Sequence, residues 1–262
     1  MFPPELPKVK NRPLYVYRVF AKWVSFFYFG TSSLLLGILV MPVMRLFLHP
    51  RKRFLKYARR FVSASMRFFF NLMHFLGCVD TEVDNQESFK QLSSKIVVAN
   101  HPSLLDSVMM ISLIPNADTI VAGYLNRNIF LREIVRRLYI LNSDDHEEIF
   151  NACDKSLKQG NCLLIFPEGT RTRRNEKVRV RKGAARIAMA CGCGVVPVHI
   201  GGTDKFGLGK KDPWTGFNPT ERYVYRITMG KEIHPDQYKS MSKSAAVRIF
   251  TKDIEAALFP EK

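Results

Sequence analysis

Residues 96–106 of this chain read IVVANHPSLLD, an apolar strand that runs directly into a turn carrying a histidine and an aspartate five positions apart. A neutral imidazole at a strand end can take a proton from a hydroxyl, and a neighbouring carboxylate can fix its tautomer and stabilise the imidazolium. We therefore predict that His101 is a general base and that Asp106 orients it. If the substrate supplies its own alcohol, no serine or cysteine nucleophile is needed.

The same residues also fit a purely structural motif. Ser103 and Asp106 have the spacing of a capping box, in which the Asp106 carboxylate would accept a hydrogen bond from a backbone N–H at a helix start. Both roles can coexist, because the positive end of a helix dipole keeps the carboxylate ionised and favours the neutral imidazole of His101.

A second cluster follows another apolar strand, in residues 163–174, which read LLIFPEGTRTRR. Gly169 permits a tight turn and Thr170 offers a hydroxyl, while Arg171 and Arg173 offer forked donors that suit phosphate. This pattern predicts a phosphate-binding loop, and the alternative is a solvated basic loop.

Three segments in this order, Asn100-His101 with Asp106, then Phe166 to Arg171, then Val195 to Val198, resemble the motifs of glycerolipid acyltransferases of the 1-acylglycerol-3-phosphate type. The likeness covers roughly residues 96–200. It implies transfer of a fatty acyl group from acyl-CoA or acyl-carrier protein to a lysolipid hydroxyl, without metal or bound cofactor. It also implies that the histidine deprotonates the acceptor and that the aspartate supports it.

The resemblance further implies a set of substrate-binding residues. The loop residues would hold the acceptor phosphate, and Pro197 would lie on the acyl-donor side, although proline in an apolar strand also simply marks an edge or a bulge. The candidates are Asn100, Ser103, Glu168, Gly169, Thr170, Arg171, Arg173 and Pro197.

Two departures from the family pattern leave the acceptor open. Members that acylate lysophosphatidate often carry a lysine shortly after the first motif and an arginine before the loop at residues 167–174, here called the arginine loop. In those two places this chain has Gly123-Tyr124 and Asn142-Ser143. The alternatives are another lysolipid, an amino-acid lipid or a specialised lipid product as acceptor. A non-catalytic, membrane-bound scaffold with an acyltransferase-like fold is a further alternative.

The net charge of +17 is concentrated in two blocks. Residues 1–60 hold twelve Lys and Arg against Glu5, and residues 171–182 hold seven against Glu176. Such a distribution indicates an anionic membrane and an anionic substrate. No nucleic-acid-reading motif accompanies it, so we expect no nucleic-acid partner.

Residues 1–79 are predicted to form a basic, aromatic-rich, membrane-associating helical region. The uncharged stretch 23–44, about 20 residues long, could span a bilayer, but both of its flanks are basic, so spanning and interfacial arrangements remain open. In the next helix, one predicted face is apolar (Phe54, Ala58, Phe61, Ser65, Phe68, Leu72, Phe75) and the opposite face is polar and mostly cationic (Lys56, Arg59, Arg60, Ser63, Arg67, Asn71). This pattern is typical of a helix that lies on anionic lipid, and the alternative is packing against the core.

Residues 80–262 are predicted to form an α/β acyltransferase domain with a mixed, largely parallel sheet flanked by helices. The strand candidates are residues 96–99, 119–122, 138–141, 162–166, 195–200 and 223–229, and the helix candidates are 104–114, 129–137, 147–158, 182–191 and 243–258. The Gly- and Pro-containing loop 201–220 is the candidate for a mobile flap. Five scattered cysteines fit a reducing compartment, and we expect the cytoplasmic face of a membrane, most simply a bacterial inner membrane.

Overall fold

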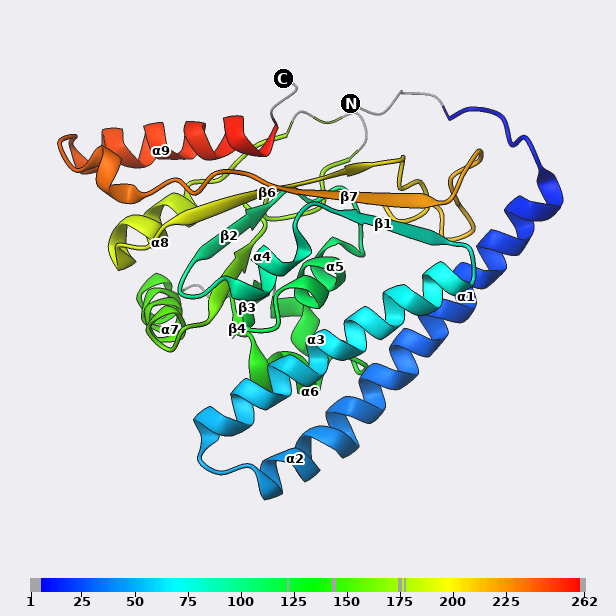
Figure 1. The fold of residues 1–262 in the computed structure, drawn as a ribbon, viewed down its shortest axis with the longest axis horizontal. Helices are drawn as coiled ribbons and strands as arrows, with labels where there is room; N and C mark the ends of the chain where they lie inside the picture. Colours follow the sequence, from blue (N-terminus) through cyan, green and yellow to red (C-terminus); the bar gives the residue numbers. More distant parts are fainter. Residues whose placement is uncertain (1–5, 122, 143–144, 174–175, 177, 260–262) are drawn as a thin grey trace.

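The computed structural model describes residues 6–121, 123–142, 145–173, 176 and 178–259, and within them a seven-stranded sheet has helices on both faces (Figure 1). The strands are β1 Val79–Val83, β2 Ile96–Ala99, β3 Ala117–Val121, β4 Ile140–Leu141, β5 Cys162–Ile165, β6 Val195–Gly202 and β7 Tyr223–Met229. Their order is β1-β7-β6-β2-β5-β3-β4. Only the β6–β7 pair among these strands is antiparallel. The predicted mixed, largely parallel sheet is therefore confirmed.

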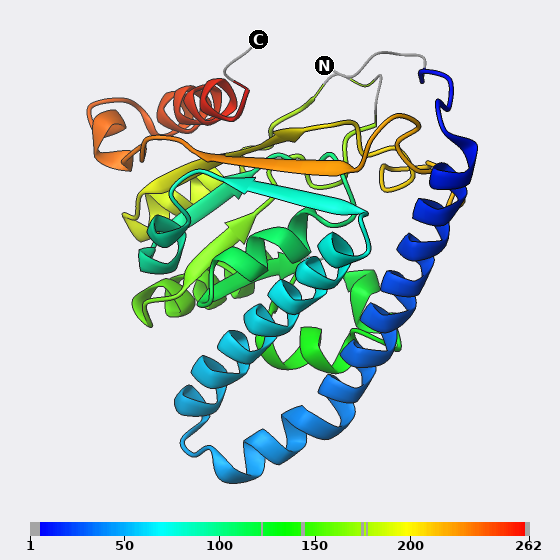
Figure 2. The same ribbon diagram turned by 45° about the vertical axis from the view of Figure 1, so that its right-hand side comes forward.

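The helices follow the order of the chain. They are α1 Arg12–Leu35, the π-helical segment η1 Leu36–Val40, α2 Met41–Phe47, α3 Arg51–Phe75, α4 Gln86–Gln91, α5 Asp106–Leu113, the short η2 Gly123–Arg127, α6 Arg132–Leu138, α7 His146–Lys158, α8 Gly183–Cys191, the short η3 Pro235–Tyr238 and α9 Lys243–Leu258. Helix α1 runs without a break through η1 into α2, and α3 returns beside it as a long hairpin (Figures 1 and 2).

The sheet buries both of its faces, which explains why its central strands are continuously apolar. All four residues of β2 are buried. Val97 and Ala99 pack in the cluster that contains α3 and α5, whereas Ile96 and Val98 pack in the cluster that contains α7, α8 and α9. Alternate β2 side chains thus anchor two separate halves of the core.

The sequence prediction missed β1 and α4 as well as the short η2 and η3, and several predicted elements have shifted bounds. β1 reads VDTEV with only its first residue buried, so it lacks the apolar signal of the central strands. α4 is only six residues long. β3 begins at Ala117 and Leu138 belongs to α6, while residue 122, included in the predicted strand, lies outside the described part.

The predicted faces of α3 are wrong in part. The buried stripe consists of Phe54, Ala58, Arg59, Val62, Ser63, Met66, Phe69, Phe70 and Met73. Phe61, Phe68 and Phe75 are exposed, although the sequence placed them on one face with Phe54. The helix turns Arg59 inward because Asp118 of β3 is buried there, with 2.8 Å between Arg59 Nη2 and Asp118 Oδ2.

The loop between β6 and β7 is docked on the sheet and is not a free flap. The buried Lys205 Nζ donates to the carbonyl of Val224 at 2.7 Å and to that of Gly201 at 3.3 Å. The Asp212 carboxylate accepts hydrogen bonds from two backbone N–H groups of the loop at 2.9 and 3.0 Å. These bonds fix the segment that the composition had suggested to be mobile.

The buried Arg59–Asp118 pair gives the first prediction. Asp118 also accepts from Ser156 Oγ at 2.7 Å, so the carboxylate joins α3, β3 and α7. Arg59→Met leaves this carboxylate buried without its cation, and we expect the free energy of unfolding to fall by about 3–5 kcal/mol in urea titration. The matched control is Arg226→Met, which removes the exposed Arg226–Glu82 pair and should cost less than about 1 kcal/mol. Equal unfolding midpoints for the two variants would contradict the prediction.

Candidate active site

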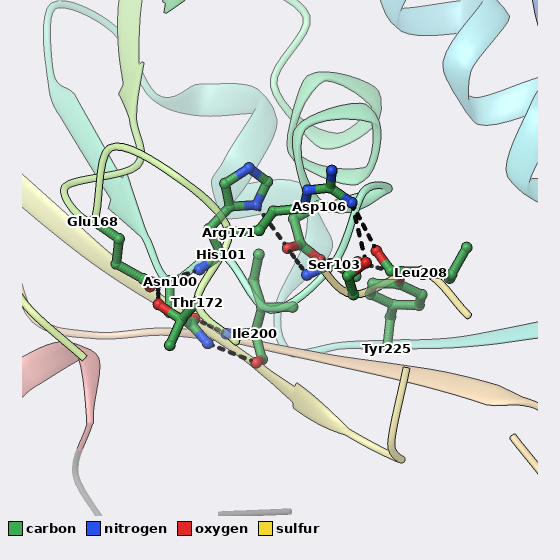
Figure 3. A network of polar contacts seen from close by, with 11 residues as sticks. Asn100, His101, Ser103, Asp106, Glu168, Arg171, Thr172, Ile200, Leu208 and Tyr225 are labelled. Atoms are coloured by element: carbon green, nitrogen blue, oxygen red, sulfur yellow. Dashed lines mark hydrogen bonds and ion pairs between the residues drawn. The ribbon is translucent and has the colours of Figure 1, made fainter. Parts of the chain in front are cut away.

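His101 and Asp106 meet at the carboxyl edge of the sheet. His101 follows the end of β2, and Asp106 is the first residue of α5. His101 Nδ1 lies 2.9 Å from Asp106 Oδ2, and Asp106 is fully buried (Figure 3). Open α/β sheets bind ligands outside the carboxyl ends of their strands, so this pair stands where a substrate is expected.

Asp106 also bonds to the turn that precedes α5. Its Oδ2 accepts from the Ser103 backbone N–H at 2.6 Å, and its Oδ1 accepts from Ser103 Oγ at 2.5 Å. The predicted capping box is formed only in part, because α5 begins at Asp106 with Leu105 as its N-cap and has no side-chain cap hydrogen bond. Because Oδ2 receives both the Ser103 N–H and the ring nitrogen of His101, the turn between β2 and α5 cannot move without moving the histidine.

The contacts of His101 determine which nitrogen is available for chemistry. A carboxylate only accepts hydrogen bonds, so Nδ1 carries its proton towards Asp106 and Nε2 keeps the lone pair. The ring stacks on Phe166 with centroids 4.3 Å apart. The imidazole is 17% exposed, which leaves an edge for a reactant.

Tyr225 of β7 belongs to the same network, although the sequence gave no signal for it. Its hydroxyl lies 2.7 Å from Ser103 Oγ. Ser103 has one hydroxyl proton, and that proton goes to the Asp106 carboxylate, so Tyr225 must be the donor to Ser103. Tyr225 therefore donates to Ser103, and Ser103 donates to Oδ1 of Asp106, whereas His101 contacts Oδ2.

Lys205 lies over the ring of Tyr225 in this network. Its Nζ is 4.7 Å from the centroid of the Tyr225 ring. Burial lowers the pKa of Lys205 to about 8, and the nearby Asp106 charge acts in the opposite direction. Lys205 thus places positive charge near the Asp106 carboxylate.

Glu168 and Asn100 hold the backbone of the histidine turn. Glu168 is buried, and its Oε1 accepts from the His101 N–H at 2.8 Å while its other oxygen accepts from Thr172 Oγ1. The Asn100 side chain forms two hydrogen bonds with the backbone of Ile200, at 2.6 and 2.9 Å (Figure 3). These contacts are structural, and direct binding of substrate by either residue stays a prediction.

The arginine loop lies against the histidine turn, as the sequence required. The Thr172 N–H donates to the His101 carbonyl at 3.1 Å. Gly169 has a φ of +73°, a left-handed conformation that favours glycine. Arg171 Nη1 donates to the Leu208 carbonyl at 3.1 Å.

The other two residues of the loop lie at its surface. Thr170 is exposed and offers its hydroxyl to solvent. Arg173 pairs with Glu176 at 2.7 Å, an exposed contact that contributes little stability. Their predicted contact with the acceptor phosphate stays a prediction.

Pro197 is not gathered with the other candidates. It lies inside β6 beside Val98 of β2, and its carbonyl accepts from the Gly230 N–H at 2.8 Å. The N–H that proline lacks would point to the same side as this carbonyl, beyond the end of β7, so no bond to β2 is lost. Pro197 is thus neither on an edge strand nor in a bulge, and among the described residues no polar contact joins it to His101.

The two departures from the family pattern lie next to each other. The Asn142 N–H bonds to the Val121 carbonyl at 2.8 Å, and a Cβ on Gly123 would be 3.7 Å from the Asn142 carbonyl oxygen. Ser143 lies outside the described residues. Gly123 and Asn142 thus lie next to each other after β3 and β4, and neither supplies a cation of the family pattern; this pair is here called the neutral site.

No group of three or more His, Cys, Asp and Glu side chains that could hold a metal occurs within the residues that the structure describes. The expected independence from metals and cofactors stays a prediction, because it concerns the reaction itself.

Comparison with known proteins finds a matching family model and relatives named as acyltransferases. Residues 80–201 match the family model described as Acyltransferase. A probable 1-acyl-sn-glycerol-3-phosphate acyltransferase of Mycoplasma genitalium is 24% identical over 178 residues, covering 64% of this chain and 66% of the relative. The 1-acyl-sn-glycerol-3-phosphate acyltransferase of Saccharomyces cerevisiae is 28% identical over 146 residues, covering 52% and 48%. The chain thus spans about half to two thirds of these curated relatives.

A solved structure shares the fold. It is the 1-acyl-sn-glycerophosphate (LPA) acyltransferase PlsC of Thermotoga maritima, with a TM-score of 0.64 and 22% identity, covering 94% of this chain and 93% of that one. The match extends over the N-terminal helices as well as the sheet. The matched family model and the relatives of the same name support the resemblance seen in the motifs: residues 80–201 of this chain match the Acyltransferase family.

Proposed function

We propose that this chain is a membrane-associated O-acyltransferase that transfers a fatty acyl group from acyl-CoA or acyl-carrier protein to a lysolipid hydroxyl, with lysophosphatidate as the first acceptor to test. The observation that carries the proposal is the buried Asp106 carboxylate on Nδ1 of His101, which leaves Nε2 free as a base. The relatives named as 1-acyl-sn-glycerol-3-phosphate acyltransferases support the choice of acceptor.

In the proposed reaction, His101 Nε2 takes the proton of the acceptor hydroxyl while the oxygen attacks the thioester carbonyl. A C–O bond forms and a tetrahedral oxyanion develops, which then collapses as the C–S bond breaks. The leaving thiolate takes the proton back from the imidazolium. The Asp106 charge stabilises that imidazolium, and the backbone N–H groups of the motif turns are candidate donors to the oxyanion. No metal or bound cofactor is required.

The distribution of apolar surface supports membrane association. Residues 12–47 form one helical run that is long and apolar enough to cross a membrane, and most of it is not buried. Its exposed side chains include Val16, Phe20, Phe27, Leu35, Ile38, Leu39, Leu46 and Phe47. Exposed apolar patches of this extent mark interaction surfaces, and the basic residues on either side suit anionic lipid.

We assign residues 1–79 to the membrane and residues 80–262 to the chemistry. The two regions share one hydrophobic cluster, in which Phe69 and Met73 of α3 pack with residues of the sheet. The amount of positive charge near the apolar helices favours the cytoplasmic face of a bacterial inner membrane, where anionic lipid is exposed.

A second acceptor class rests on the neutral site at Gly123 and Asn142. A lysolipid with a less charged head group, an amino-acid lipid or a specialised lipid alcohol would not need the two missing cations. Turnover assays with a panel of these acceptors distinguish the possibilities. A non-catalytic scaffold is excluded if purified protein turns over any acyl thioester with any of them.

The general base gives the second prediction. His101→Ala should reduce kcat by about 10²–10⁴-fold, because the acceptor hydroxyl loses its base, while binding of the acyl donor is retained. The assay is mass spectrometry of products formed from acyl-CoA and a mixture of lysolipids and glycerol phosphate, with donor binding measured separately. Full turnover by a folded His101→Ala protein would refute the role.

The hydrogen bonds that link Tyr225 through Ser103 to Asp106 give the third prediction. Tyr225→Phe removes one hydrogen bond of about 1 kcal/mol, so kcat should fall roughly five- to tenfold, with the acceptor KM unchanged and the pH–rate profile displaced. Tyr223→Phe is the matched control, because Tyr223 lies on the same strand and its hydroxyl donates to the Phe206 carbonyl at 2.7 Å, away from Asp106. Indistinguishable pH–rate profiles for the two variants would count against the assignment.

The arginine loop gives the fourth prediction. Arg171→Ala should raise the KM for a phosphate-bearing acceptor at least tenfold, since a hydrogen bond to a charged group contributes about 1.5–3 kcal/mol, and it should change kcat little. Arg186→Ala, on the exposed face of α8, is the control for loss of one positive charge. If both variants show the same acceptor kinetics, Arg171 does not bind the acceptor.

A further inference from the structure

Helix α1 holds the loop between β6 and β7 through one of its faces. Tyr15, Arg18 and Lys22 follow each other by three and four positions, so they lie on the same side of the helix. The Phe217 N–H donates to Tyr15 Oη at 3.3 Å, and Arg18 Cζ lies 6.0 Å from the centroid of the Phe217 ring. Lys22 Nζ donates to the Trp214 carbonyl at 2.8 Å.

Lys22 is the tightest of these links. It is fully buried, and its Nζ also donates to the carbonyls of Gly216 at 2.5 Å and Gly207 at 3.4 Å. A Cβ on Gly207 would lie 2.0 Å from the Gly216 oxygen and 3.0 Å from Lys22 Nζ, so the loop closes around the ammonium only with glycine at this position. A buried ammonium is costly without such acceptors, so helix and loop move together.

Leu208, the residue after Gly207 in this loop, contacts the turn that follows His101 and the arginine loop. The Leu208 carbonyl accepts from the Leu104 N–H at 2.9 Å and from Arg171 Nη1 at 3.1 Å, and Arg171 also reaches the Gly209 carbonyl at 3.4 Å. Gly207 and Leu208 are adjacent, so one carbonyl binds the lysine of α1 and the following one binds the proposed acceptor-binding arginine. Figure 3 shows Arg171 reaching towards Leu208.

The solvent-facing side of the contact between α1 and the β6–β7 loop is aromatic. Trp23 of α1 and Trp214 of the loop are 5.9 Å apart between ring centroids, and they are 46% and 58% exposed. Phe26 lies edge-on to Trp214, and Phe27 is 74% exposed. Indole rings with one wet and one apolar side favour the head-group level of a bilayer, and Lys211 on the loop adds positive charge for anionic lipid.

We propose that Trp23 and Trp214 form one lipid-contact patch, here called the indole patch, and that Lys22 couples the docking of this patch on an anionic bilayer to the position of Arg171. The inference rests on the proposed membrane-associated function and adds to it a second membrane-contacting segment, the β6–β7 loop. Lys22 is a positioning residue, because it acts on Arg171 through the loop and does not touch the acceptor.

The chain contains two tryptophans, both in the indole patch, so intrinsic fluorescence reports on it directly. Trp23→Phe leaves Trp214 as the sole reporter, and Trp214→Phe leaves Trp23. On addition of phosphatidylglycerol–phosphatidylcholine vesicles, both emissions should shift to shorter wavelength and be quenched by brominated acyl chains. Flotation of the full chain with the same vesicles is measured in parallel.

The outcomes separate this inference from the proposed function. Flotation with an unchanged, unquenched Trp214 emission overturns the indole patch and leaves membrane association intact. No flotation overturns both. A shift that depends on protein concentration without vesicles assigns the patch to a second copy of the chain and overturns the lipid assignment.

Coupling is tested with Lys22→Met, which keeps the aliphatic stem and removes the ammonium. Losing hydrogen bonds from a charged donor should raise the KM for a vesicle-presented acceptor roughly tenfold, with kcat changed less than about twofold. Lys252→Gln, which removes an exposed lysine of α9 outside the membrane-assigned region, should leave both unchanged. If Lys22→Met does not fold, Trp214→Ala, at an exposed residue, takes its place. It should raise the KM for the vesicle-presented acceptor and leave the KM for a monomeric, short-chain acceptor unchanged. An unchanged vesicle KM in the folded variant would overturn the coupling.

Discussion

The Asp106 carboxylate is the group on which the geometry of the site depends. It accepts from His101 Nδ1, from the Ser103 N–H and from Ser103 Oγ, and it is buried. A buried charge is tolerated only when hydrogen bonds satisfy it, so removing any of these donors weakens the whole turn. The contacts of the turn before α5 therefore also fix the tautomer of His101, the proposed base. Under the proposed function, one side chain would serve both folding and catalysis.

Strand order brings the second motif to the first. β5 pairs with β2 in parallel, so the chain that leaves β5 emerges beside the chain that leaves β2. Glu168 then bonds to the His101 N–H, and on the other side Asn100 bonds to Ile200 of β6. The His101 turn is held from both neighbouring strands, which is how a surface loop gains the rigidity that a general base requires.

The sequence predicted what short-range patterns encode. β2 and β5 are apolar runs buried on both faces, and the His101–Asp106 pair lies within a few residues of one of them. Tyr225 could not be found this way, because its partner Ser103 is 122 positions distant. The rotation of α3 has the same origin, since Arg59 turns inward for a carboxylate 59 positions away. β1 was missed because an edge strand with a half-buried Asp and exposed Thr and Glu carries no apolar alternation.

Electrostatics bears on which acceptor the site favours. A cation about 4 Å from a phosphate contributes roughly 4 kcal/mol at an effective dielectric constant near 20, so under the proposed function a site without the lysine and arginine of the family pattern would attract a doubly charged phosphomonoester less strongly. Arg171 remains, but one of its nitrogens already donates to the carbonyls of Leu208 and Gly209. A guanidinium has five N–H donors, which leaves enough for one phosphate oxygen pair. Under the proposed function, Arg171 would compensate for one negative charge of a phosphate, and a second negative charge would need a further cation such as the half-buried Arg173 of the same loop.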